Sequence, residues 1–150
     1  MSDNWLLYLN KYDYFFYYFC DNPGCFGRAW LVQNYSAVTG ACIMIRKSTY
    51  FEVNGLDEEN LTAAFNDVDF CIKVRNAGYR NLWSPFAELY HHESATRGSD
   101  LAPEKVERFN REVAYMKQQH ADELISDPAY NPNLDLISSH FALAFPPREQ

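Results

Sequence analysis

The stretch from residue 64 to residue 97 constrains the fold of this chain more than any other part. Its spacing predicts a helix from about Val68 to Ala77, and Gly78 follows at the position that a left-handed helix cap requires. Two short strands are predicted next, over residues 79–83 and 87–91. A helix, a tight turn and a strand in close succession indicate an α/β fold, in which helices pack on a sheet.

Acidic and imidazole side chains stand at the two ends of this unit. Asp67 and Asp69 lie where the helix begins, and His91 and His92 end the second strand. A carboxylate can act as a base, and an imidazole can bind a metal ion. Because neighbouring strand residues face opposite sides, only one of the two histidines should face a given site. Helix capping by the acids and packing of the histidines are the structural alternatives.

Length and composition restrict the class of protein. The chain of 150 residues is the size of one domain, and its 11 Tyr, 11 Phe and 3 Trp are enough to build a core. The formal net charge of −7, with no cluster of Lys and Arg, argues against a nucleic-acid partner. Four cysteines show no disulfide framework, and two of them, Cys42 and Cys71, lie in apolar segments where Cys is a small buried hydrophobe. We therefore expect reduced thiols and a cytoplasmic protein.

Residues 5–19 form an apolar, strongly aromatic segment. Lys11 and Asp13 interrupt it, and it is shorter than the roughly 20 residues that span a bilayer. It also lacks the basic start and the cleavage site of a signal peptide. Two interpretations stay open. The segment packs within the domain or against a second copy of the chain, or it attaches peripherally to a membrane surface.

The segment between these two regions predicts a strand and a helix. Residues from Ala37 to Arg46 form a nearly continuous apolar run, which is typical of a strand buried on both faces. Residues from Lys47 to Asn54 predict a short helix with Gly55 as its stop, and an acidic loop follows over residues 56–61. The sequence thus predicts a mixed sheet with flanking helices.

A second, longer helix is predicted near the C-terminus. Pro103 suits its first turn, and a helix of about 20 residues should follow. Its apolar stripe, which we interpret as packing surface, consists of Val106, Phe109, Val113, Met116, His120 and Leu124. The predicted organisation is an aromatic segment over residues 1–21, an α/β region over 22–101, a long amphipathic helix over 102–126 and an irregular, Pro-containing tail over 127–150.

Three ordered motifs give the chain a family likeness. They read SAVTGACIMIRKSTYFEVNGLDE, FNDVDFCIKVRNAGYRNLWSPFAELYHHESATRG and DPAYNPNL. From about Asn22 to Arg148 the chain resembles the C-terminal half of bacterial family 2 glycosyltransferases. The resemblance implies the GT-A architecture, a Rossmann-like α/β domain that transfers a sugar from a nucleotide-sugar donor with the help of a divalent metal ion. Residues 22–101 would then be the acceptor-side half of such a domain.

The resemblance also implies roles for single residues. Asp67 stands where these enzymes place the second acid of an acidic pair, which implies that it is the catalytic base. Asn66 replaces the first acid of that pair, so no second carboxylate is implied there. His91, with His92 as the alternative, stands where metal-dependent members bind Mn²⁺ or Mg²⁺. Arg97 resembles a residue that holds the donor diphosphate as it leaves, and an exposed loop arginine is the alternative interpretation.

Thr39 and Gly40 correspond to the acceptor side of the site, and the implied partners are a nucleotide-sugar donor and a saccharide or lipid-linked acceptor. The family's nucleotide pocket and its Asp-x-Asp metal motif have no counterpart before Thr39. We therefore expect a truncated enzyme without transferase activity of its own. A non-catalytic module that forms homodimers through exposed apolar surface and the aromatic N-terminus is the alternative. A metal-dependent hydrolase built on Asp67, His91 and His92 is a third hypothesis.

Overall fold

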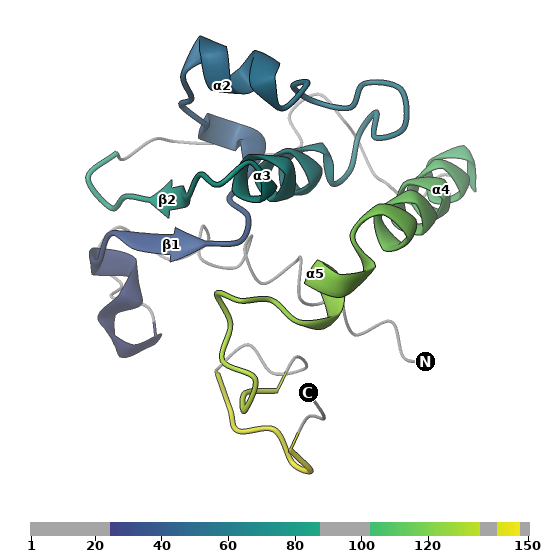
Figure 1. Ribbon diagram of the computed structural model, residues 1–150. Coiled ribbons are helices and arrows are strands. Elements are labelled where there is room, and N and C mark those ends of the chain that lie inside the picture. The colour runs from purple at the N-terminus through teal and green to yellow at the C-terminus, as the bar shows by residue number, and fades with distance from the viewer. Residues whose placement is uncertain (1–24, 88–102, 136–140, 148–150) are drawn as a thin grey trace.

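The computed structural model of the chain describes residues 25–87, 103–135 and 141–147. In chain order, its elements are the 3₁₀ helix η2 (Cys25–Trp30), β1 (Gln33–Tyr35), the 3₁₀ helix η3 (Gly40–Cys42), α2 (Lys47–Glu52), α3 (Asn66–Asn76), β2 (Asn81–Trp83), α4 (Pro103–Gln119) and α5 (Ala121–Ile125). Figure 1 shows α3 in the middle of the described residues, between α2 and α4. The chain is a small mixed α/β structure whose described strands form one two-stranded sheet.

The helix α3 is the centre of the core, because apolar residues cover it on two sides. One cluster joins α3 to the end of α2 and consists of Val53, Phe70 and Val74, with Ile43, Ile45 and Tyr50 packed against it. The other joins α3 to α4 and consists of Leu61, Ile72 and Met116. Residues two apart on a helix point about 200° away from each other, so Phe70 and Ile72 serve opposite sides. The predicted helix is confirmed within two residues, and its Gly78 cap has a φ of +89°.

The sheet is antiparallel and is tied to α3 by one amide side chain. β1 pairs with β2, and Tyr35 lies opposite Asn81. The buried Asn81 Nδ2 donates to the carbonyl oxygens of Ser36 and Cys71, each at 2.9 Å. The strand predicted over residues 79–83 is therefore present, shortened to Asn81–Trp83.

The run from Ala37 to Arg46 is not the doubly buried strand that its composition predicts. Its middle forms the 3₁₀ helix η3, and the residues after η3 alternate in exposure. Ile43 and Ile45 pack toward the core, whereas Met44 is 99% exposed. In the described structure α3 and α2 cover this segment from one side, so every second side chain faces solvent.

The short helix α2 and its stop are confirmed. It begins at Lys47 as predicted and ends at Glu52, two residues before the predicted end. Gly55 has a φ of +60° and donates from its backbone N–H to Tyr50 O at 2.8 Å. A Cβ on Gly55 would lie 2.6 Å from the Tyr50 ring, so this turn needs glycine for its conformation and its space.

The helix predicted from Pro103 is present in two parts. α4 ends at Gln119 and α5 begins at Ala121, with His120 between them at a φ of −129°. In the predicted stripe, Met116 and His120 are buried, whereas Val106 is 45% exposed. The stripe therefore packs on α3 through its C-terminal part.

Beyond α5, the described residues run as turns and a single antiparallel bridge between Leu134 and Leu143. The aromatic segment 5–19 and the strand predicted over residues 87–91, apart from Ala87, lie outside the described residues. Among the helices that the structure describes, none is long and apolar enough to cross a membrane.

Candidate functional site

Asp67 lies in the first turn of α3, and backbone N–H groups hold both of its carboxylate oxygens. The N–H of Gly40 donates to Oδ2 at 2.6 Å, and the N–H of Val68 donates to Oδ1 at 2.9 Å. The preceding residue, Phe65, has a φ of +64° at the helix N-cap, so the chain turns sharply into α3. The carboxylate is half-buried, and each oxygen accepts one hydrogen bond from the described residues although a carboxylate oxygen can accept two.

The partner of Asp67 is a turn that Thr39 organises. Thr39 caps η3 by accepting from the Ala41 N–H through its Oγ1 at 3.3 Å. Gly40 then presents its N–H to α3, and a Cβ on Gly40 would lie 3.1 Å from the Asp67 Cβ. The structure thus brings together three residues that the sequence assigns to one site: Thr39, Gly40 and Asp67.

Cys71 fixes the same turn one residue earlier. Its buried Sγ lies 3.5 Å from the Val38 nitrogen, which donates to it, and 3.7 Å from the Val38 oxygen. Burial raises the pKa of the Cys71 thiol to about 11, and the charge of Asp67 acts in the same direction. Cys71 is the buried hydrophobe that the sequence predicts, whereas the same prediction is wrong for Cys42, which is exposed.

Asn66, at the position that the resemblance matches to an acid, serves the fold. Its Nδ2 donates to Leu61 O at 2.8 Å and to Asp57 O at 3.2 Å, and its Oδ1 accepts from the Asp57 N–H at 3.0 Å. An ionised carboxylate has no proton to donate to either carbonyl. The amide therefore fits this position better than the usual acid, and it holds the 57–61 loop against the start of α3.

Asp69 points away from Asp67 and lies in a buried ionic cluster. Its Oδ1 is 2.8 Å from His120 Nε2, and its Oδ2 is 2.9 Å from Lys73 Nζ. Burial raises the pKa of Asp69, but the hydrogen bonds and charges of His120 and Lys73 outweigh it and lower that pKa below its ordinary value. In the described structure Asp69 therefore serves the fold through its ion pair with Lys73 and its contact with His120.

Glu112 of α4 holds the loop that leads into α3. Its side chain is almost fully buried, and it accepts from Thr62 Oγ1 at 2.9 Å, the Ala63 N–H at 3.0 Å and the Ala64 N–H at 2.9 Å. The sequence analysis did not identify this residue. A signal existed, because Glu112 lies three residues after Phe109 and four before Met116, on the stripe that faces the core.

A second contact of α4 reaches the same loop. Tyr115 Oη donates to Asp57 Oδ2 at 2.6 Å, and Asp57 also accepts from the Asn60 and Glu59 N–H groups. Burial raises the pKa of Asp57, but these hydrogen bonds outweigh it and lower that pKa to about 2. The hydrogen bond to Asp57 raises the pKa of Tyr115 to about 12. This contact was also not predicted.

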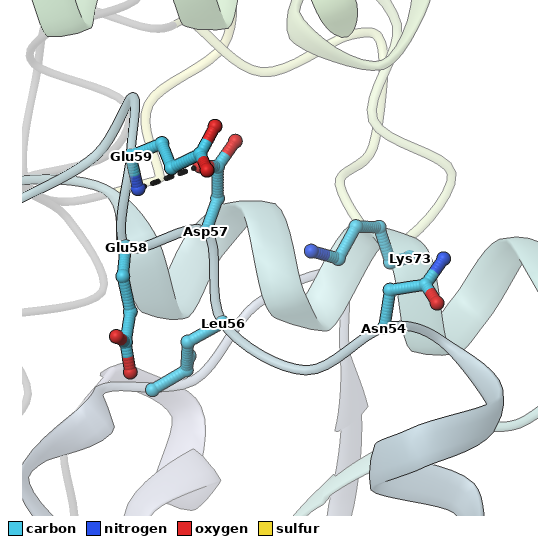
Figure 2. Close-up of a pocket in the computed structure, with 6 residues that line it drawn as sticks. All are labelled: Asn54, Leu56, Asp57, Glu58, Glu59 and Lys73. Carbon is cyan, nitrogen blue, oxygen red and sulfur yellow. Dashed lines mark hydrogen bonds between the residues drawn. The ribbon is translucent and has the colours of Figure 1, made fainter.

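An open pocket of about 410 Å³ lies beside this loop. Figure 2 shows its lining, which consists of Asn54, Leu56, Asp57, Glu58, Glu59 and Lys73. Of the predicted site residues that the structure describes, which are Thr39, Gly40 and Asp67, none lines it. Two of its charged groups are engaged within the protein, since Asp57 binds the Glu59 N–H and Lys73 pairs with Asp69.

The remaining site residues of the sequence analysis, which are His91, His92 and Arg97, lie outside the described residues. Within the described ranges, no group of three or more His, Cys, Asp or Glu side chains could hold a metal ion. The structure thus describes the carboxylate and the turn of the predicted site, and their roles stay predictions.

Comparisons with known proteins give partial similarities. The chain is 54% identical over 126 residues to an uncharacterized protein of Sinorhizobium fredii, a match that covers 84% of this chain and 14% of that protein. It is 29% identical over 124 residues to an O-antigen biosynthesis protein of Myxococcus xanthus, covering 83% of this chain and 9% of that protein. It is 26% identical over 84 residues to an N-acetylglucosaminyl-diphospho-decaprenol L-rhamnosyltransferase of Mycobacterium tuberculosis, covering 56% of this chain and 27% of that protein.

The chain therefore spans between 9% and 27% of the length of these relatives. No family model matches it, and no solved structure matches it. The comparisons relate the chain distantly to part of a protein of O-antigen biosynthesis and to part of a rhamnosyltransferase.

Proposed function

We propose that residues 22–101 form the acceptor-side half of a family 2 glycosyltransferase domain with the GT-A architecture. Such a domain transfers a sugar from a nucleotide-sugar donor to a hydroxyl acceptor. The observation that carries the proposal is the setting of Asp67. Its carboxylate is half-buried at the N-terminus of α3, and its hydrogen bonds in the described structure come from the backbone N–H groups of Gly40 and Val68. The partial similarity to a rhamnosyltransferase and to an O-antigen biosynthesis protein supports the same activity.

Asp67 has the chemistry of a general base for this reaction. As the acceptor oxygen bonds to the anomeric carbon of the donor sugar, its hydroxyl proton passes to the Asp67 carboxylate. The bond between that carbon and the donor phosphate breaks, and the nucleoside diphosphate leaves with the electron pair. Asp69 is excluded from this role because His120 and Lys73 occupy its oxygens inside the core.

We assign the remaining roles as the family resemblance implies. His91, or His92 in its place, would bind Mn²⁺ or Mg²⁺, and imidazole suits Mn²⁺ better because Mg²⁺ prefers oxygen ligands. Arg97 would hold the leaving diphosphate. Within the described ranges no group of side chains forms a metal site.

The test compares two isosteric substitutions. The measurements use a longer version of the chain that includes a donor-binding half, because the chain alone is expected to be inactive. Calorimetry measures binding of UDP- and dTDP-sugars with and without Mn²⁺, and transfer of labelled sugar to a saccharide or lipid-linked acceptor measures turnover. Asp67→Asn should lower turnover by about 10²- to 10⁴-fold and leave donor binding unchanged, because a general base contributes in that range. The control is Asp122→Asn, which changes an exposed aspartate on α5. Full turnover by Asp67→Asn would exclude Asp67 as the base.

A non-catalytic interaction module is the second candidate. It is favoured by large apolar side chains at or next to the sheet that are more than half exposed: Trp30, Leu31, Val32 and Leu82. Monomeric proteins rarely expose large contiguous apolar patches. If the longer version that includes a donor-binding half also binds no donor at millimolar concentration and transfers no sugar, and the chain sediments as a dimer, this second candidate replaces the first.

A further inference from the structure

The contact between Gly40 and Asp67 joins two segments that are 27 residues apart, at a distance of 2.6 Å. We propose that Gly40 is a positioning residue, whose N–H fixes the orientation of the Asp67 carboxylate and whose missing side chain leaves room for it. The inference rests on the proposed function, because a fixed carboxylate matters for turnover only if Asp67 is the base.

The hydrogen bond is of the kind that orients a charged group strongly. A backbone N–H that donates to a carboxylate makes a charge-assisted bond, which is shorter and about twice as strong as a neutral one. With the Val68 N–H on Oδ1, the two oxygens of Asp67 are each held once. A carboxylate has about four acceptor positions, so positions on both oxygens remain for an acceptor hydroxyl.

The glycine at position 40 is not needed for backbone conformation. Gly27, Gly55 and Gly78 all have a φ between +60° and +89°, where other residues are strained. Gly40 lies outside that region, so an alanine could adopt its backbone. What an alanine could not do is avoid Asp67, because its Cβ would lie 3.1 Å from the Asp67 Cβ and 3.3 Å from Oδ2.

The turn that carries Gly40 is anchored on both sides of it. Val38 is bound to the Cys71 sulfur of α3, and Ala41 donates to the Thr39 side chain. The donor therefore has a fixed direction before any substrate binds. Such preorganisation is what lets a base accept a proton without a rearrangement.

The first measurement is amide hydrogen exchange at Gly40, followed by NMR. Asp67→Ala should speed exchange of the Gly40 amide by about 10- to 100-fold, the range that corresponds to losing a hydrogen bond to a charged group. The Asn60 amide, which donates to Asp57 at 2.9 Å, is the control and should not change. Equal exchange at Gly40 in both proteins would overturn the contact and the inference with it.

The second measurement separates positioning from folding. Gly40→Ala should lower kcat by about tenfold or more and leave the acceptor KM within about twofold, because it disturbs the base and not the bound substrate. Gly78→Ala is the matched control, since it strains a positive φ with open space around it and lies at the far end of α3. It should lower stability and leave kcat unchanged. Wild-type kcat in Gly40→Ala would overturn the positioning role.

The two proposals fail in different ways. If Asp67→Asn keeps full turnover while the Gly40 amide still depends on Asp67, the contact is structural, and both the base role of Asp67 and the positioning role of Gly40 are overturned. If Asp67→Asn abolishes turnover while Gly40→Ala does not lower kcat, the proposed function stands and the role of Gly40 falls. The chain alone is expected to transfer no sugar, so turnover is read in a longer version that includes a donor-binding half. If that longer version transfers no sugar, both the proposed function and the positioning role are overturned.

Discussion

Two aspartates on the first turn of α3 lie only two residues apart, yet their surroundings differ completely. Asp69 is 3% exposed and makes ion pairs with Lys73 and His120, which come from α3 and from the junction of α4 and α5. Asp67 is half-buried, and backbone N–H groups hold it. The two side chains point about 200° apart around the helix axis. Asp69 therefore faces the core, whereas Asp67 stays partly exposed.

The first turn of α3 therefore carries one aspartate, Asp69, that stabilises the fold and another, Asp67, to which we assign the proposed chemistry. Removing a partner from a buried ion pair leaves an uncompensated charge, so a change at Asp69 should destabilise the fold. Among the described residues, no side chain donates a hydrogen bond to Asp67, so in this part of the chain it can accept a proton without breaking the core. The contacts of Glu112 and Tyr115 with the loop over residues 57–64 belong to the structural side, because they place the start of α3.

The largest expected effect comes from replacing each aspartate by alanine in turn and comparing the stability of the two variants. Asp69→Ala should lower the free energy of unfolding by about 3 kcal/mol, because the buried His120 loses its hydrogen-bond partner and the partly exposed Lys73 loses its ion pair. Asp67→Ala should lower it by about 1 kcal/mol, since two backbone N–H groups at a half-exposed position can turn to water. Urea unfolding at pH 7 measures both. Equal losses for the two variants would contradict the division of roles.

Glu112 offers the next largest effect. Glu112→Gln should lower the free energy of unfolding by about 2–3 kcal/mol, because one oxygen becomes an NH₂ group that cannot accept from Thr62, Ala63 or Ala64. Glu107→Gln is the matched control on the same helix, and it removes an exposed pair with Arg111 that should contribute less than about 0.5 kcal/mol. A similar small loss in both variants would show that α4 does not hold the loop.

The sequence predicts the parts of this fold that depend on local signals. α2 and α3 are recognised because apolar spacing and glycine stops lie within one segment, at Gly55 and Gly78. The run over residues 37–46 is misread because apolar composition does not tell whether one layer or two cover a segment. The break at His120 is also missed, since its stripe continues without interruption across the two helices.

The contacts of the candidate site also differ in whether the sequence could predict them. The family resemblance places Thr39, Gly40 and Asp67 in one site, and the structure brings them together. The partners of Asp57 and Asp69 could not be predicted, because Tyr115 and His120 lie 58 and 51 residues away from them in the sequence. A pairing at that separation depends on how α4 packs on α3, and no local pattern encodes it. The roles of His91, His92 and Arg97 stay predictions.

The smallest expected effect is the pH dependence of the stability that the Tyr115–Asp57 hydrogen bond contributes. The pKa of Asp57 is lowered to about 2 in the folded chain, below its ordinary 3.8, so the stability it contributes is present above about pH 4 and is lost as pH falls toward 2. The pKa of Tyr115 is raised to about 12, so its contribution is present below pH 10 and is lost as pH rises through 12. The contact therefore weakens at both ends of the pH range.

Tyr115→Phe isolates this contact without leaving a cavity. At pH 7 it should lower the free energy of unfolding by about 1 kcal/mol, because the pair is partly exposed and water screens it. It should also reduce the loss of stability between pH 4 and pH 2 without abolishing it, since Asp57 keeps the Asn60 and Glu59 N–H groups and Asp69 also has a lowered pKa. Tyr79→Phe removes an exposed hydroxyl bound to Glu52 and is the control that should leave the acid limb unchanged. If Tyr115→Phe and wild type lose stability equally in acid, backbone donors alone set the pKa of Asp57, and α4 holds the loop through Glu112 without the help of Tyr115.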